Sequence, residues 1–292
     1  MSPDLFSVFA EMIMRKIEDC EGIKVGGRNI NNIRYADDTA LVADSSEKLQ
    51  HMLNVMNEEG LRRGQKINFK KTKYMVIGKE VDNAEELVCS NEKIPRVAKF
   101  NYLGSIITAD GRCEEAIKQR IGIAKTAFRR MESMLTNRKM TLKTRKNAAK
   151  TYIWSKLLYG AETWTISKTM EARIEAMEMW IWRRLTKIPW AEKRTNISVL
   201  QLVGEKREMM KAIRKRQLQF FGHIMRREGA EKLSLTGMIE GRRGRGRPRE
   251  KYMTRLCQLF RGGPTPVEVI RSTQDRTVWK NMVADVLEDM AR

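Results

Sequence analysis

The chain has 292 residues, of which 41% are hydrophobic and 32% charged, enough for one or two domains with a buried core under a charged surface. The formal net charge of +21 is unevenly distributed, because residues 1–100 carry 16 basic and 16 acidic side chains and the rest carry 41 and 20. This asymmetry predicts a balanced domain followed by a region that binds a polyanion, either nucleic acid or an anionic membrane surface.

Several classes of protein are disfavoured. The cysteines are scattered without metal-ligand spacing, which argues against a zinc site and a disulfide scaffold and favours a reducing compartment: Cys20, Cys89, Cys113 and Cys257. No apolar run approaches transmembrane length. The N-terminal segment is interrupted by charge and lacks a small-residue cleavage site, so it is not expected to be a signal peptide.

The first 111 residues show mixed periodicity. Residues 1–19 are predicted to form a helix with an apolar stripe at Leu5, Val8, Phe9, Met12, Ile13 and Ile17. Residues 45–64 are predicted to form a second helix, capped by serine and buried along Leu49, Met52, Leu53 and Met56. Strands or hairpins are predicted in four further segments: 22–30, 30–44, 66–79 and 99–111.

From about residue 112 the pattern becomes helical. Five amphipathic segments are predicted as helices: 114–135, 142–164, 171–185, 206–227 and 275–290. Their tryptophans fall on helical patterns, so core packing is favoured over base stacking. Residues 241–250 form a Gly/Arg/Pro segment that cannot build a core and is predicted to be a flexible basic arm. The expected fold class is α+β, a small antiparallel sheet followed by a mainly helical region.

The adjacent carboxylates of Asp37 and Asp38, in the stretch YADD at Tyr35–Asp38, are the first candidates for chemistry. Mg²⁺ prefers carboxylate oxygens, and two-metal phosphoryl transfer takes ligands from at least two chain segments. The stretch could therefore be half of a metal site. Asp-Asp is also common turn chemistry, and these four residues alone favour that interpretation.

The neighbouring segments change this weighting, because four blocks together resemble the reverse transcriptases of non-LTR (LINE-like) retrotransposons. SPDLF resembles the block that precedes the catalytic hairpin, YADD the hairpin itself, GLRRGQKINFKKTKYM the next motif, and FNYLGSIIT the primer grip. The blocks keep the family's order and spacing over roughly residues 1–110. A looser likeness to the helical region after the polymerase core runs through the remainder. The resemblance implies these divisions: a palm segment at 1–111, a helical thumb-like region at 112–240, the basic linker at 241–250 and C-terminal helices at 251–292.

The resemblance also implies roles for individual residues. Asp37 and Asp38 would bind Mg²⁺, and Lys71 would act near the departing pyrophosphate as a candidate general acid. The remaining positions would contact nucleotide, template and primer: Ser2, Pro3, Tyr35 and Ala36 at the nucleotide and template site, and Tyr102, Leu103 and Gly104 at the primer grip. The implied reaction is Mg²⁺-dependent, RNA-directed addition of nucleotides to a DNA primer.

One departure from the family qualifies this expectation. The family's other metal-binding aspartate lies upstream of the SPDLF block, and Met1 of this chain falls just before that block. Nothing downstream resembles a replacement, so we expect no polymerase activity from this polypeptide alone. Two alternatives remain, a domesticated nucleic-acid-binding protein without catalysis and a decayed gene product without selected activity.

The basic arm is a second candidate for binding nucleic acid. Its arginines are Arg242, Arg243, Arg245, Arg247 and Arg249, and RGRP at Arg245–Pro248 resembles the core of an AT-hook. A disordered basic linker is the favoured interpretation of such a short match, and a nuclear localisation patch is another. The expected partners are RNA template and DNA primer, with no membrane, in the cytoplasm, the nucleus or both.

Overall fold

The computed structural model describes residues 3–78, 86–239 and 251–290, and its internal contacts divide the chain into two compact units. Unit 1 contains the described parts of Met1–Phe100, Thr108–Gly111 and Gly229–Gly246. Unit 2 contains Asn101–Ile107, Arg112–Glu228 and the described part of Arg247–Arg292. The chain therefore enters unit 2 briefly at residues 101–107, leaves unit 1 again after residue 111 and returns to it at residue 229.

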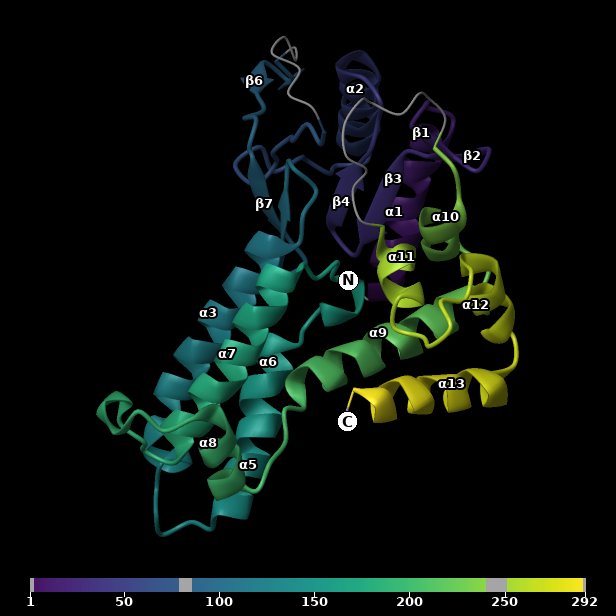
Figure 1. Cartoon of the computed structure of the whole chain (residues 1–292). Coiled ribbons are helices and arrows are strands. Elements are labelled where there is room, and N and C mark those ends of the chain that lie inside the picture. Colours follow the sequence, from purple (N-terminus) through teal and green to yellow (C-terminus); the bar gives the residue numbers. More distant parts are fainter. Residues whose placement is uncertain (1–2, 79–85, 240–250, 291–292) are drawn as a thin grey trace. The chain divides into compact units, whose positions relative to one another are not determined.

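Unit 1 combines three helices with short antiparallel hairpins (Figure 1). Its helices are α1 (Pro3–Glu18), α2 (Ser46–Arg62) and α10 (Ala230–Thr236). Its hairpins pair β1 (Ile23–Val25) with β2 (Arg28–Ile30), β3 (Asn32–Tyr35) with β4 (Asp38–Leu41), and β5 (Val88–Cys89) with β6 (Glu92–Lys93). A fourth hairpin pairs β7 (Lys99–Tyr102) with β8 (Ser105–Thr108), and its tip groups with unit 2.

The core of unit 1 lies between α1 and α2. Met14, Ile17 and Cys20 pack on Met52, which confirms the buried stripe of α2. The predicted serine cap is also present, since Ser45 accepts a hydrogen bond from the backbone N–H of Lys48 at 3.3 Å.

The apolar stripe of α1 is only partly buried. The C-terminal half of the helix is covered, with Ile17 fully buried. In its N-terminal half, Leu5, Val8 and Met12 are 61%, 64% and 52% exposed. The prediction of the helix is confirmed, and the structure buries its apolar stripe only in the C-terminal half.

The strand predicted over residues 66–79 is wrong. Residues 65–78 contain turns and extended backbone, and their β-pairing is a single parallel bridge between Tyr74 and Arg96. The N–H of Tyr74 donates to the carbonyl of Pro95, and the N–H of Val97 donates to the carbonyl of Tyr74. One bridge of this kind does not make a ladder, so β-propensity alone misled the sequence interpretation.

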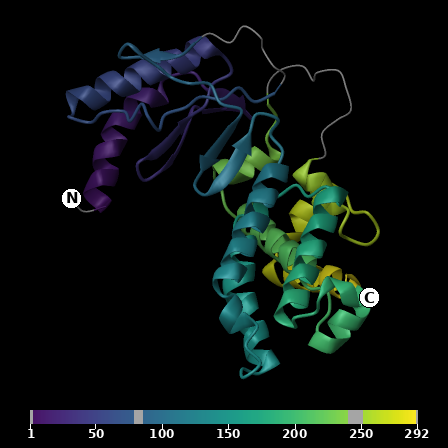
Figure 2. The same cartoon turned by 90° about the vertical axis from the view of Figure 1, so that its left-hand side faces the viewer.

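Unit 2 is built of helices (Figures 1 and 2). Its α-helices are α3 (Glu114–Arg130), α4 (Glu132–Leu135), α5 (Leu142–Ala148), α6 (Ser155–Leu157), α7 (Lys168–Leu185), α8 (Asn196–Val203), α9 (Met209–Met225), α11 (Tyr252–Cys257), α12 (Pro266–Ser272) and α13 (Arg276–Asp289). A π-helical turn, η1 (Ala149–Trp154), joins α5 to α6, and two 3₁₀ turns, η2 (Ala161–Thr163) and η3 (Trp190–Glu192), follow. The helices between α3 and the start of α9 share one apolar core, with buried residues from Ile117 to Ile213. Helices α3, α6 and α7 lie side by side in both views.

The tryptophans of unit 2 contribute to this core, as predicted. Trp154, Trp164 and Trp182 are buried in it, and the rings of Trp154 and Trp182 lie with centroids 6.2 Å apart. Trp279 is buried elsewhere in the unit, against Phe221 and Phe260. The α+β fold class is confirmed, with two-stranded antiparallel sheets in place of one continuous sheet. In the described residues, no helix is long and apolar enough to span a membrane.

Asn31 connects the end of α1 to the start of β3, and its replacement tests this connection. Its buried side-chain amide donates to the carbonyls of Ile17 and Cys20 at 2.6 and 2.8 Å, which satisfies acceptors that a helix end leaves open. We predict that Asn31→Ala lowers the free energy of unfolding by about 1–3 kcal/mol, because those carbonyls become buried without partners. Urea unfolding followed by circular dichroism measures this loss.

Asn54→Ala is the matched control, because Asn54 is exposed on α2 and accepts a hydrogen bond from Gln50 one turn away. A loss of stability equal to that of Asn31→Ala would show that Asn31 has no special role in unit 1.

Candidate active-site hairpin

The acidic pair lies at the tip of the β3–β4 hairpin. Tyr35 pairs with Asp38, which leaves Ala36 and Asp37 as a two-residue turn. Ala36 has φ of +54°, a left-handed conformation that such turns require and that glycine or asparagine usually supplies. A non-glycine residue held in this region costs about 1–3 kcal/mol, and strain of this kind concentrates at functional sites.

The tip presents its polar groups to solvent. Asp37 and Asp38 are both exposed, and Tyr35 is 66% exposed. Because Tyr35 and Asp38 are cross-strand partners, their side chains share one face of the hairpin. Carboxylate oxygens of this kind suit a hard cation such as Mg²⁺, which keeps several water ligands and takes others from phosphates.

The hairpin alone does not supply a complete ligand set. Within the described residues, no three Asp, Glu, His or Cys side chains come together as a group that could hold a metal ion. The acidic pair therefore offers two adjacent carboxylates, which fit part of a magnesium site, and further ligands would have to come from elsewhere.

An ion pair beside the tip of this hairpin ties β3 to α1. The guanidinium of Arg34 donates to the carboxylate of Glu11 at 2.7 Å. This hydrogen bond and the charge of Arg34 lower the pKa of Glu11 from its usual value. The side chains of Arg34 and Glu11 are 33% and 38% exposed, so water screens their attraction. The pair therefore orients the strand more than it stabilises the unit.

Lys71 follows a tight turn in unit 1. The N–H of Lys71 and that of Thr72 both donate to the carbonyl of Asn68, at 3.0 and 2.9 Å, and the hydroxyl of Thr72 donates to the same oxygen. The side chain of Lys71 is exposed and makes no ion pair with the described residues. It is accessible to a phosphate, and its catalytic role stays a prediction.

The predicted primer-grip residues form the tip of the β7–β8 hairpin, which groups with unit 2. Leu103 and Gly104 have φ of +49° and +76°, so both central residues of the turn are left-handed. This is the geometry of a two-residue hairpin turn that twists with its strands. Tyr102 ends β7 and is half-buried, and Leu103 is 38% exposed.

Two residues that the sequence interpretation missed hold this tip. The guanidinium of Arg120, on α3, donates to the carbonyl of Gly104, and the hydroxyl of Tyr159 donates to the carbonyl of Leu103 at 3.0 Å. The Arg120 guanidinium also stacks 4.1 Å from the centroid of the Tyr159 ring. We call this pair the Arg120–Tyr159 clamp. Its one signal in the sequence is an arginine within the buried stripe of α3, between Ala116 and Ala124.

Burial lowers the pKa of Arg120, and the neighbouring Tyr159 opposes that shift. An arginine stays charged under such a shift, so Arg120 remains a donor to the turn at any physiological pH. The clamp therefore fixes the carbonyls of Leu103 and Gly104 against α3 within unit 2.

The remaining predicted site residues are only partly described. Ser2 and the arm arginines lie outside the described residues: Arg242, Arg243, Arg245, Arg247 and Arg249. Pro3 is the first residue of α1, a position that suits proline because its missing N–H would have no helical partner.

Comparison with known proteins agrees with the arrangement of these motifs. Residues 1–107 match the family of reverse transcriptases (RNA-dependent DNA polymerases). A transposon-derived protein of Caenorhabditis elegans is 27% identical over 213 residues, which are 70% of this chain and 75% of that protein. No solved structure matches the chain. The family match ends within the β7–β8 hairpin and includes the whole β3–β4 hairpin. Residues 1–107 are therefore similar to the reverse transcriptase family, and most of the chain is similar to a transposon-derived protein.

Proposed function

We propose that this chain is the C-terminal part of the catalytic machinery of a non-LTR retrotransposon reverse transcriptase. In this proposal Asp37 and Asp38 would hold Mg²⁺, which would supply positive charge for the phosphates of the incoming nucleotide. The observation that carries the proposal is the exposed and strained tip of the β3–β4 hairpin. A turn with only a structural role would be less strained with glycine or asparagine in place of Ala36, so the strain supports a functional role.

The chain's own residues would act around that metal. Tyr35 shares a face with Asp38, which suits a contact with the primer end or the nucleotide. Lys71 would approach the departing pyrophosphate, and the clamped tip of Leu103 and Gly104 would support the primer strand. The match of residues 1–107 to the reverse transcriptase family supports contact with nucleic acid, and RNA template and DNA primer are the specific partners proposed here.

We also propose that the acidic pair needs further carboxylates from other polypeptide to polymerise. One hairpin cannot surround two ions, and the described residues hold no larger ligand cluster. Exposed apolar side chains on α1 and β3 support this view, because they form faces that a larger palm would bury: Leu5, Val8, Met12 and Ile33. The alternative of a domesticated binding protein without catalysis is not favoured by the family match.

Primer extension tests this function directly. We predict that the 292-residue chain incorporates no more deoxynucleotide on an RNA template with a DNA primer than its Asp37→Asn variant does. Where the reading frame continues upstream of Met1, the longer product should extend the primer in Mg²⁺. Asp37→Asn should then reduce the rate at least a hundredfold, because loss of a charge-stabilising group costs at least that much.

Glu92→Gln, an exposed carboxylate on another hairpin of unit 1, is the control for charge and should leave extension unchanged. Extension by the 292-residue chain that survives Asp37→Asn would refute the assignment of the acidic pair.

Metal binding has a readout that does not depend on activity. Mn²⁺ is paramagnetic and takes the same oxygen ligands as Mg²⁺. We predict that low concentrations of Mn²⁺ selectively broaden the NMR signals of the backbone amides of residues 36–38, and that Asp37→Asn with Asp38→Asn removes the effect. The adjacent, exposed pair Glu18 and Asp19 in the same unit is an internal control. Equal broadening at both pairs would mean that the hairpin has no preference for a metal ion.

The Arg120–Tyr159 clamp gives a further prediction. Tyr159→Phe removes the hydroxyl that donates to the carbonyl of Leu103, and one such bond contributes about 1 kcal/mol. Amides of residues 101–107 should therefore exchange hydrogen about fivefold faster. Tyr152→Phe is the matched control, because the hydroxyl of Tyr152 belongs to a 53% exposed side chain without a hydrogen bond in the described residues. Unchanged exchange in Tyr159→Phe would show that the clamp does not hold the tip.

A further inference from the structure

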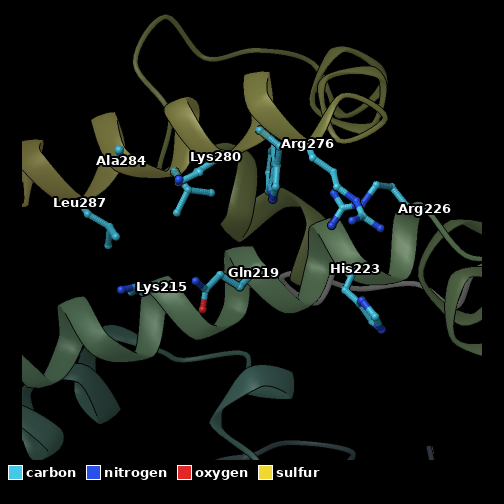
Figure 3. A pocket seen from close by; sticks show the side chains of 10 residues that line it. Lys215, Gln219, His223, Arg226, Arg276, Lys280, Ala284 and Leu287 are labelled. Atoms are coloured by element: carbon cyan, nitrogen blue, oxygen red, sulfur yellow. The ribbon is translucent and has the colours of Figure 1, made fainter.

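A basic cleft runs between α9 and α13 in unit 2. It has a volume of about 640 Å³, and its charged lining comes from both helices. Helix α9 contributes Lys215, His223 and Arg226, and α13 contributes Arg276 and Lys280. Figure 3 shows the two helices as opposite walls of this cleft. Neither hairpin of the proposed catalytic site contributes to it.

The walls are held at a fixed separation by Trp279. The indole N–H of Trp279 donates to the carbonyl of Leu218 at 3.1 Å, and its ring lies 5.8 Å from the ring of Phe221. A Cβ at Gly222 would lie 2.2 Å from the indole nitrogen, so only glycine allows this approach. Trp279 is 4% exposed and is therefore part of the support of the cleft, unavailable for stacking on a base.

The charges of the cleft lack acidic partners. No carboxylate is among the lining residues, and within the described part of the chain Lys215, Arg276 and Lys280 make no ion pair. The nearby carboxylate of Asp275 accepts instead from the N–H groups of Thr277 and Val278, as the cap of α13.

Two guanidinium groups converge at one end of the cleft. Arg226 donates to the carbonyl of Thr273 at 2.9 Å, which holds its side chain in place. Figure 3 shows the side chains of Arg226 and Arg276 pointing toward one another. Two like charges held close together repel one another. An anion bound between them attracts both and offsets this repulsion. Guanidinium groups bind phosphate oxygens in a planar, two-pronged geometry.

The extent of the charged row favours a polymer over a single phosphate group. Lys215 and Arg226 are eleven residues apart on α9, or about 16 Å along a helix axis at its usual rise. Successive phosphates of one strand of B-DNA advance about 3.4 Å along the duplex axis, so the row spans several of them. A lipid headgroup or a free phosphate would occupy only one position in it.

We propose that the α9–α13 cleft binds the sugar-phosphate backbone of nucleic acid, without reading its bases. The binding is sequence-independent, because the lining offers cations and no exposed ring of tryptophan, tyrosine or phenylalanine. It goes beyond the function proposed above, since it needs neither the acidic pair nor the primer grip.

The test compares two variants of equal charge in the full chain. The cleft variant is Arg276→Gln with Lys280→Gln, both exposed on α13, and the control variant is Lys168→Gln with Arg173→Gln, both exposed on α7 of the same unit. Binding to a labelled single strand of mixed sequence is measured as a function of salt. The cleft variant should lower the slope of log affinity against log salt by about 1.4, the value for two lost phosphate contacts on a single strand.

The control variant should change the slope by less than half as much, and Arg276→Lys with Lys280→Arg should restore binding. Equal losses in the two glutamine variants would overturn the proposal, because the cleft would then be ordinary charged surface. An unchanged slope in the cleft variant would overturn it as well. So would a loss confined to binding of phosphatidylcholine vesicles that contain phosphatidylserine, since the cleft would then serve a membrane.

Two further measurements separate this proposal from the catalytic one. Asp37→Asn should leave the salt slope unchanged, because the acidic pair belongs to unit 1. Circular dichroism of the cleft variant should match the parent chain, and a variant that fails to fold is replaced by Lys215→Gln alone, for which a slope change of about 0.7 is expected.

Discussion

Two adjacent carboxylates at a two-residue turn repel one another, and this constraint shapes the N-terminal unit. The side chains of Asp37 and Asp38 are exposed, because two adjacent carboxylates are costly to bury away from water, and this disfavours burial of the β3–β4 tip. The hairpin must therefore project from its unit while its base stays fixed. Asn31 supplies that fixing, because its amide joins β3 to the last carbonyls of α1. The left-handed conformation of Ala36 follows from the pairing of Tyr35 with Asp38, because a two-residue connection between paired strands requires it.

Local chemistry made the hairpins and most helices predictable from the sequence. Gly26 and Gly27, both at positive φ, form the turn that their order suggests, and the Ser45 cap starts α2 where expected. Prediction failed where the outcome depends on a partner that the sequence does not reveal. The apolar residues around Tyr74 have strand propensity but find one bridge instead of a ladder. The period of α1 correctly indicates an apolar face, but no pattern states what covers that face, and Leu5 is left 61% exposed.

The parts of the candidate sites that escaped prediction are long-range contacts. The clamp joins Leu103 to Tyr159 across 56 positions, and Trp279 reaches Leu218 across 61. Spacing along a helix or strand carries no information about such pairs. An arginine in an apolar stripe, such as Arg120, is the one local sign, because a buried cation needs hydrogen-bond acceptors nearby. Motif resemblance located the tips of both hairpins, whereas the residues that hold the primer-grip tip emerge only from the fold.

Net charge alone does not locate the surface that meets a polyanion, because many cations of unit 2 are already engaged. Lys150 lies 2.8 Å from Glu205 and 2.9 Å from Glu208, and Lys146 shares Glu205. Hydrogen bonds from these lysines lower the pKa of Glu205 against the effect of burial, so the cluster stays ionised and serves the packing of its helices. Such lysines contribute to the total of +21 but offer little to a phosphate. The cations available for nucleic acid are those that the fold leaves without carboxylates and holds on facing helices, and the α9–α13 cleft meets both conditions.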